Sequence, residues 1–327
     1  MDRFDEELVL ARLSRPRAEE TTFAVVSDAH VTPDAAETWK VFHRTERRLR
    51  TVVEDANRLG ADGLVFAGDL TKDGAPEEFD LVDEILADLD VPLAGVPGNH
   101  DAPKEFDPHE TPSLDAFAER YAPGSLPYRT TLGGVDLVGL NSAAADDGSL
   151  AATHAGRISD SQLSWLDRRV DPETPTVAVF HHPLSHLSDL VPEFRPESHF
   201  QLENAAEVGE LLAAKDVDLV VSGHVHWPTV ARAHGVTQVT TAAACSLPQA
   251  YLLVRVEPTG TTVSMVPLSD AAGFEEAYEY ARADTGRDGA LVACVDGGYF
   301  DDCPLVDERE PAGGAAPATD APGVLYR

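Results

Sequence analysis

The sequence predicts an α/β fold in which two stacked, mixed β-sheets are flanked by helices. First, the opening hundred residues alternate short apolar runs with helical patterns, an order typical of parallel strands covered by helices. Second, Gly133-Gly134 separates two apolar runs, which indicates a hairpin and antiparallel pairing. Third, the alternation returns after residue 159 and ends in several short strands over 230–267.

The N-terminal elements follow from periodicity. Residues 1–20 are charged, and we expect weak helix there. Phe23 to Val26 forms a continuous apolar run, which predicts a buried strand. Apolar side chains recur at helical intervals over about 35–59, and Gly60 ends that pattern. The remaining elements of this part are a strand over 63–67, a helix over 77–89 and a strand over 92–96.

The later elements complete the two sheets. We expect strands over 128–132, 135–140, 176–180 and 218–221, and helices over 159–170, 203–214 and 274–283. An apolar patch follows at 290–295. These patterns divide the chain into a charged segment (1–20), a main domain (21–268), a C-terminal extension (269–300) and a flexible acidic tail (301–327).

The composition is strongly acidic. Asp and Glu number 57 against 25 Lys and Arg, a formal charge of −32, and only four of the basic residues are lysines. Such a chain repels itself in dilute buffer but is screened at molar salt, where the Debye length is about 3 Å. This composition is typical of salt-accumulating halophiles.

We expect a cytoplasmic protein without membrane association. The N-terminus lacks a basic and then apolar leader, and no run approaches the ~18 apolar residues of a membrane span. The three cysteines, Cys245, Cys294 and Cys303, lie too far apart to indicate a disulfide framework or a zinc knuckle.

Five short groups of metal-binding side chains each follow an apolar run. Oxygen donors and imidazoles in this mixture suit a pair of divalent first-row metals, and strand ends bring such groups to one sheet edge. The groups are Asp28-Ala29-His30, Gly68-Asp69, Gly98-Asn99-His100-Asp101, His181-His182-Pro183 and Gly223-His224-Val225-His226.

Each group has a chemical role in such a site. On extended backbone, Asp28 and His30 would point to the same side and chelate one ion. Asp69 can bridge two ions about 3.5–4 Å apart, whose repulsion needs a shared anion. Alone, each group could be a turn or a surface feature, so their joint occurrence carries the prediction. The other donors are the Asn99 oxygen and the nitrogens of His181, His224 and His226.

In this order the motifs resemble those of the calcineurin-like metallophosphoesterase superfamily, over about residues 21–267. The resemblance implies a four-layer αββα fold and two divalent metal ions, with Mn, Fe, Zn and Co all left open. It implies that Asp69 bridges the ions. It further implies that Asp28, His30 and His226 hold one ion, and Asn99, His181 and His224 the other.

The resemblance also favours one branch of the superfamily. The helical segment 161–166 ahead of His181 resembles that of bacterial cyclic-nucleotide phosphodiesterases. The motifs of the protein phosphatases are absent, and no tyrosine follows Asp69 as it does in purple acid phosphatases.

These residues predict an enzyme that hydrolyses a phosphate ester by attack of a metal-bridging hydroxide. His100 would stabilise the phosphoryl oxygens and donate to the leaving oxygen. Three further residues each have two open roles. Asp101 either orients His100 or caps a turn, His182 either orients substrate or packs, and Arg195 either binds a second phosphate or forms a surface ion pair.

The favoured function is a phosphodiesterase for a small or cyclic-nucleotide-type diester. The alternative is a phosphomonoesterase for nucleotides or other small phosphates. A non-catalytic binding scaffold is the third hypothesis, but such a scaffold would lack ligands, and all seven positions are filled. We find no basic stripe that would follow a nucleic acid. The expected partner is therefore a small phosphorylated substrate, and the oligomeric state is left open.

Overall fold

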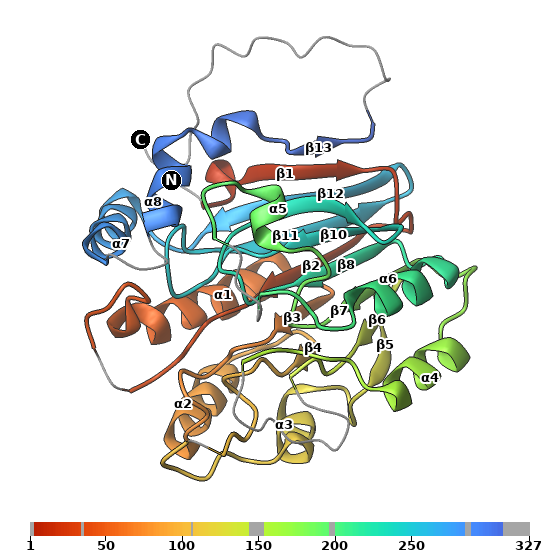
Figure 1. Cartoon of the computed structure of the whole chain (residues 1–327), viewed down its shortest axis with the longest axis horizontal. Coiled ribbons are helices and arrows are strands. Elements are labelled where there is room, and N and C mark those ends of the chain that lie inside the picture. Colours follow the sequence, from red (N-terminus) through yellow and green to blue (C-terminus); the bar gives the residue numbers. More distant parts are fainter. Residues whose placement is uncertain are drawn as a thin grey trace.

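The computed structural model describes residues 3–33, 36–105, 107–143, 154–195, 200–284 and 289–309. Two β-sheets lie face to face, and helices cover their outer faces (Figure 1). The predicted fold class is therefore confirmed.

The first sheet contains seven strands in the order β13-β1-β12-β11-β2-β3-β4. The strands β2, β3 and β4 are parallel, whereas β11 pairs antiparallel with both β2 and β12. Three helices pack on the outer face through an apolar layer: α1 (Thr45–Leu59), α2 (Pro76–Leu86) and α3 (Leu114–Tyr121). The strands are β1 (Leu8–Leu13), β2 (Thr21–Val26), β3 (Gly63–Ala67), β4 (Leu93–Val96), β11 (Ala250–Glu257), β12 (Gly260–Pro267) and β13 (Val306–Asp307).

The second sheet contains six strands in the order β5-β6-β7-β8-β10-β9. Its outer face carries α4 (Asp160–Arg169) and α6 (Ala205–Ala214). The main core fills the space between the sheets, where Val25 of the first sheet and Val177 of the second belong to one apolar cluster. The strands are β5 (Tyr128–Leu132), β6 (Val135–Gly139), β7 (Thr176–Val179), β8 (Leu219–Ser222), β9 (Thr229–Ala233) and β10 (Val236–Thr240).

Two predictions for the N-terminal part were wrong. After a short 3-10 helix (η1, Arg3–Glu6), residues 8–13 form β1 and not a helix. β1 pairs with β12 and buries Leu10 and Leu13 in the intersheet core, so tertiary pairing overrides weak local preference. The helix expected from about residue 35 begins only at Thr45, after a 3-10 turn (η2, Phe42–Arg44).

The C-terminal extension packs on the main domain. It forms α7 (Ala271–Ala283), α8 (Gly289–Asp296) and η3 (Tyr299–Asp302). Ala277 and Leu291 share an apolar cluster with Val41 and Trp227, next to the short helix α5 (Leu187–Leu190). Among the helices described, none is both long and apolar enough to cross a bilayer.

Part of the segment that we expect to be a flexible tail (301–327) forms a strand. Residues 306–307 form β13, which pairs parallel with β1 at the sheet edge. Arg12 Nη1 donates to Asp307 Oδ2 at 2.9 Å across this pair, so an ion pair holds the segment in place. Residues 310–327 lie outside the described residues.

An ion pair joins α7 to η2, directly before α1, and gives a pH-dependent prediction. Arg44, assisted by His43, lowers the pKa of Glu276 to about 2, well below its ordinary value. The stabilisation of the fold by the Glu276 ion pair is therefore complete above the ordinary glutamate pKa near 4.3 and is lost as the pH falls through 2. We expect Glu276→Gln to lower the unfolding free energy at pH 7 by no more than about 1 kcal/mol, since both side chains are partly exposed.

Thermal melts of Glu276→Gln and of the matched variant Glu275→Gln at pH 7 and pH 3 would check this. Glu275 is an exposed neighbour on the same helix. The destabilisation should be specific to Glu276 and smaller at pH 3. A gap that widens on acidification would contradict the ion-pair account.

Candidate metal centre

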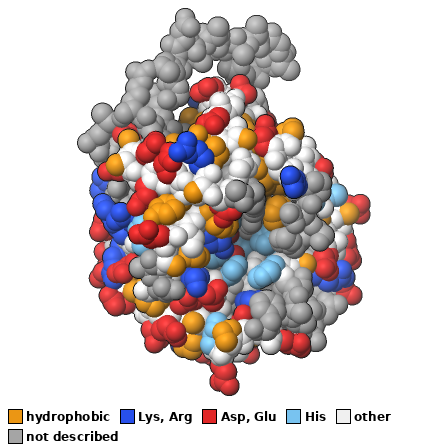
Figure 2. Space-filling view, turned by 60° about the vertical axis from the view of Figure 1, so that its left-hand side comes forward, with side chains coloured by type: hydrophobic (Ala, Val, Ile, Leu, Met, Phe, Trp, Pro, Cys, Tyr) orange, Lys and Arg blue, Asp and Glu red, His pale blue; other side chains and the backbone are white. Residues whose placement is uncertain are grey.

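The five predicted groups all lie at the carboxyl ends of strands. The groups that begin at Asp28, Gly68 and Gly98 follow the parallel strands β2, β3 and β4, and the other two follow the parallel strands β7 and β8. Their side chains meet where these strand ends converge, and Figure 2 shows histidines exposed in a hollow of one face. We call the following seven residues the Asp69 cluster: Asp28, His30, Asp69, Asn99, His181, His224 and His226.

Asp69 lies at the centre of this cluster. Its Oδ2 is 3.2 Å from His181 Nε2 and 3.6 Å from His30 Nε2, and its Oδ1 accepts the backbone N–H of His100 at 2.8 Å. One carboxylate therefore joins groups from both sheets.

Asp28 forms a second centre beside it. Its Oδ1 is 3.1 Å from His226 Nε2, and its Oδ2 accepts the backbone N–H of His224 at 3.0 Å. Ser27 Oγ donates to the same Oδ2 at 2.7 Å. The Asp28 carboxylate is thus oriented by hydrogen bonds on one oxygen and presents the other to the cluster.

The backbone of the cluster is left-handed at five non-glycine positions. The extended conformation expected for Asp28 and His30 was wrong, because their φ angles are 51° and 45°. Backbone hydrogen bonds hold this loop to the one after β3, since His30 N–H donates to the Asp69 carbonyl at 3.0 Å. Such backbone strain persists only where its surroundings fix it, and it gathers at functional sites. The other three positions are Asp69, His224 and His226, at 53°, 70° and 58°.

Glycines in two of the motifs are required by close packing within the cluster. A Cβ on Gly68, which has φ +94°, would lie 2.3 Å from His181 Nδ1. A Cβ on Gly98 would lie 2.1 Å from Asp69 Oδ1. In each case the glycine makes room for a side chain of the Asp69 cluster that follows another strand.

The cluster fits a pair of metal ions. Three of its buried polar atoms, Asp28 Oδ1, Asn99 Oδ1 and His181 Nε2, have no hydrogen-bond partner in the described part of the chain. Two groups of potential ligand atoms, each within 4.8 Å, share Asp69: one adds His30 and His100, the other His181 and His224. A shared carboxylate between two donor groups is the arrangement that a bridged ion pair needs.

Backbone and hydroxyl oxygens orient the imidazoles. His181 Nδ1 donates to the Ala67 carbonyl at 2.8 Å, and His226 Nδ1 bonds to Ser246 Oγ at 2.9 Å. His100 Nδ1 donates to the Lys72 carbonyl. In all three rings Nε2 is left to face the cluster, as in metal sites whose ligands are held by outer hydrogen bonds.

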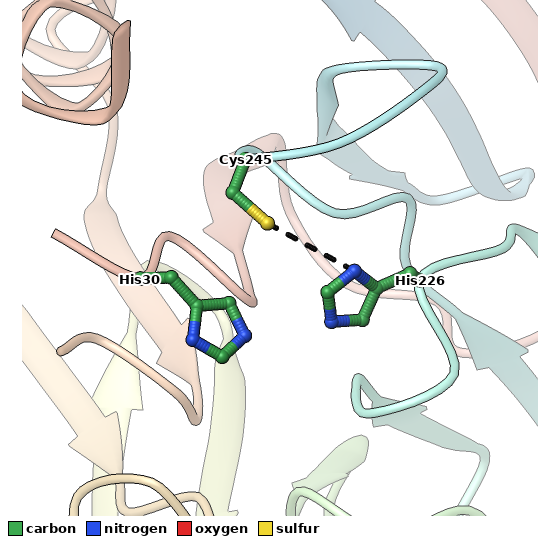
Figure 3. A group of neighbouring side chains, drawn as sticks. All are labelled: His30, His226 and Cys245. Carbon is green, nitrogen blue, oxygen red and sulfur yellow. Dashed lines mark hydrogen bonds between the residues drawn. The ribbon is translucent and has the colours of Figure 1, made fainter. Parts of the chain in front are cut away.

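Cys245 extends the cluster on the His226 side. Figure 3 shows its sulfur directed at His226, with 3.9 Å between Sγ and Nδ1. Its Sγ also lies within 4.8 Å of a ring nitrogen of His30. Burial raises the pKa of the Cys245 thiol to about 12, so without a bound metal the thiol stays protonated at neutral pH.

The pKa values of the two central carboxylates, Asp28 and Asp69, lie below their ordinary range. Burial alone would raise the pKa of Asp69, but His181 and His100 hold it well below its usual range. Burial also opposes protonation of His181, yet Asp69 raises the pKa of that imidazole to about 9. Before metal binds, positive charge on His181 therefore offsets negative charge on Asp69.

Asp101 does not orient His100. It is buried, and its two oxygens accept the backbone N–H groups of Leu70, Thr71 and Gly98, together with the Thr71 hydroxyl, at 2.8–3.1 Å. Burial, with Asp69 nearby, raises the pKa of Asp101 to about 6, so it is still mostly ionised at neutral pH. Asp101 caps the turns that carry Asp69 and Asn99, and the Lys72 carbonyl orients His100.

Both ring nitrogens of His182 are hydrogen-bonded within the protein, which favours the packing role over the substrate role. The ring is fully buried, with Nδ1 bonded to Ser142 Oγ and Nε2 to the His154 carbonyl, both at 2.9 Å. No ring nitrogen is left for a substrate. Arg195 is exposed and borders residues 196–199, which lie outside the described residues, so its substrate role stays a prediction.

Sequence reasoning missed two side chains beside the cluster. His154 Nδ1 lies 2.9 Å from Asn99 Nδ2, and its ring stacks on His100 at 5.4 Å. Lys40 Nζ lies 3.1 Å from His30 Nε2. Neither residue belongs to a motif, and only their positions in the folded chain bring them to the cluster.

A family model for the calcineurin-like phosphoesterases matches residues 21–228. The chain belongs to this family. A probable cyclic nucleotide phosphodiesterase of Rhodococcus erythropolis is 28% identical over 210 residues, which cover 61% of this chain and 63% of that relative. A cAMP/cGMP dual specificity phosphodiesterase of Mycobacterium tuberculosis is 29% identical over 209 residues, which cover 61% of this chain and 59% of that protein. The matched region thus spans about three-fifths of these relatives.

Solved structures of the calcineurin-like phosphoesterase fold agree with the architecture. A dimetal phosphatase from Danio rerio superposes with a TM-score of 0.55 at 16% identity, covering 76% of this chain and 99% of that one. At this identity the likeness shows the fold alone.

If Asp69 bridges two ions, its replacement should remove metal. We expect Asp69→Asn, reconstituted with Mn²⁺ in molar KCl, to retain fewer than two ions per chain, because a neutral amide offsets their repulsion poorly. Metal content by mass spectrometry would check this, with Asp167→Asn, whose side chain is 62% exposed, as the control. Two tightly bound ions in Asp69→Asn would refute the bridging role.

Proposed function

We propose that this calcineurin-like phosphoesterase is a two-metal phosphodiesterase that hydrolyses a small diester of the cyclic-nucleotide type. The observation that carries the proposal is the position of Asp69 between two donor groups, with His100 beside them. Two relatives, a probable cyclic nucleotide phosphodiesterase and a cAMP/cGMP dual specificity phosphodiesterase, support the diester class.

The Asp69 cluster would hold the two divalent ions. When bound, such ions supply Lewis acidity to the phosphate and lower the pKa of a water molecule toward neutrality. Asp69 would contact both. Asp28, His30 and His226 would hold one ion, and Asn99, His181 and His224 the other.

His100 would act on the substrate phosphate. Burial, with Lys40 nearby, lowers the pKa of His100 to about 3, so the ring is neutral at pH 7 before substrate arrives. Its Nδ1 proton is committed to the Lys72 carbonyl, so Nε2 needs a second proton in order to donate. The negative charge of a bound phosphate favours that protonation. Nε2–H can then stabilise a phosphoryl oxygen or protonate the leaving oxygen.

A His100→Ala variant separates this role from metal binding. We expect two metal ions to remain bound and kcat to fall by about 10²–10⁴-fold, the usual contribution of a positioned acid. The control is His234→Asn, at an exposed left-handed position in the β9–β10 turn, which asparagine tolerates. Unchanged turnover in His100→Ala would exclude His100 from the chemistry.

The ester class can be tested with matched substrates. We expect the metal-loaded enzyme in molar KCl to hydrolyse bis(p-nitrophenyl) phosphate with a higher kcat/KM than p-nitrophenyl phosphate. It should also cleave 3′,5′-cyclic AMP faster than it dephosphorylates 5′-AMP. Faster hydrolysis of the monoesters would favour the phosphomonoesterase alternative.

We also propose that the enzyme works in a salt-rich cytoplasm. The support is its formal charge of −32, which needs screening for the compact state.

A further inference from the structure

A separate cavity of about 400 Å³ lies between the N-terminal parts of α1 and α7. None of the residues of the Asp69 cluster lines it. Its walls include Arg44, Arg47, Arg48, Ser269, Gly273 and Glu276, and we call it the arginine cavity. At this place Arg44, directly before α1, donates from its Nε to Glu276 Oε2 of α7 at 3.1 Å.

Arg44 is paired with Glu276, but Arg47 and Arg48 add two more positive charges at the same place. Arg44, Arg47 and Arg48 are spaced three and four residues apart, so they share one helix face, where like charges repel. They also occupy the N-terminal end of α1, where the helix dipole disfavours cations. In a chain with only 25 basic residues, this concentration of positive charge indicates an anionic partner.

The carboxylates in the wall of the cavity have other partners. Glu276 pairs with Arg44 and with His43. Asp270 caps α7, where its Oδ1 accepts the Gly273 N–H at 2.9 Å. Among the described residues, neither carboxylate forms an ion pair with Arg47, so the charge of that exposed side chain is available to a ligand.

The site is also preorganised. Arg48 is only 4% exposed, and its Nη1 is fixed on the Cys245 carbonyl at 2.7 Å. Ser269 Oγ is buried and has no hydrogen-bond partner among the residues described. Both the guanidinium and the hydroxyl can donate hydrogen bonds to a phosphate oxygen.

We propose that the arginine cavity binds the phosphate group of a small anion, either inorganic phosphate or a phosphate monoester. Guanidinium groups match tetrahedral phosphate through paired N–H donors. The volume lies in the range of small-molecule sites, and so leaves room for an organic group on the phosphate. This second anion site is independent of the phosphate that the Asp69 cluster would take as substrate.

Calorimetric titration of the metal-loaded, full-length chain with inorganic phosphate and with methyl phosphate tests the proposal at constant ionic strength. The variant is Arg47→Gln, which alters an exposed side chain in the cavity wall. The matched control is Arg50→Gln on the same helix, because Arg50 faces Glu46 and Glu84 and does not line the cavity.

We expect Arg47→Gln to weaken one binding event at least tenfold and Arg50→Gln to leave it intact. The compound with the greater affinity in that event identifies the source of the phosphate group. Any binding event that remains in Arg47→Gln is assigned to the metal centre. A missing event at the metal centre can therefore be distinguished from a missing event at the arginine cavity. Identical isotherms for wild type, Arg47→Gln and Arg50→Gln would overturn the proposal.

Discussion

The sharing of one buried carboxylate between two sheets is the constraint on which the rest of the site depends. Asp69 follows β3 of the first sheet and contacts His181, which follows β7 of the second sheet. The packed core between the sheets fixes how far apart these strand ends lie. The left-handed turns and the glycines at 68 and 98 then bring the side chains into contact. The packing of the two sheets therefore sets the distances between the side chains of the Asp69 cluster.

The distribution of charge follows the same logic. Asp and Glu outnumber Lys and Arg by 57 to 25, yet the buried Asp69 carboxylate also needs a positive partner, and His181 supplies that charge. Asp101 shows the other use of a buried acid, since it satisfies backbone N–H groups at the base of the ligand loops. Exposed acids can respond to salt, but these buried ones depend on fixed partners.

The sequence predicted what strand order and local motifs encode. Each strand and the potential ligand after it could be predicted, because the apolar run and the polar residue lie within a few positions of each other. These polar residues are Asp28, Asp69, Asn99, His181 and His224. Contacts between residues far apart in the sequence leave no local pattern from which they could be predicted. Strand β1 owes its conformation to β12, about 250 residues away, and His154 reaches Asn99 only in the folded chain. The role of Asp101 was ambiguous for the same reason, since its partners lie in the loop after β3.

The central claim is that Asp69 bridges two ions, and magnetic coupling tests it most directly. Electron paramagnetic resonance of the protein loaded with Mn²⁺ in molar KCl distinguishes a bridged pair from isolated ions. The account predicts two equivalents of manganese per chain and the broad spectrum of an exchange-coupled pair. A six-line spectrum from uncoupled manganese at full loading would contradict it.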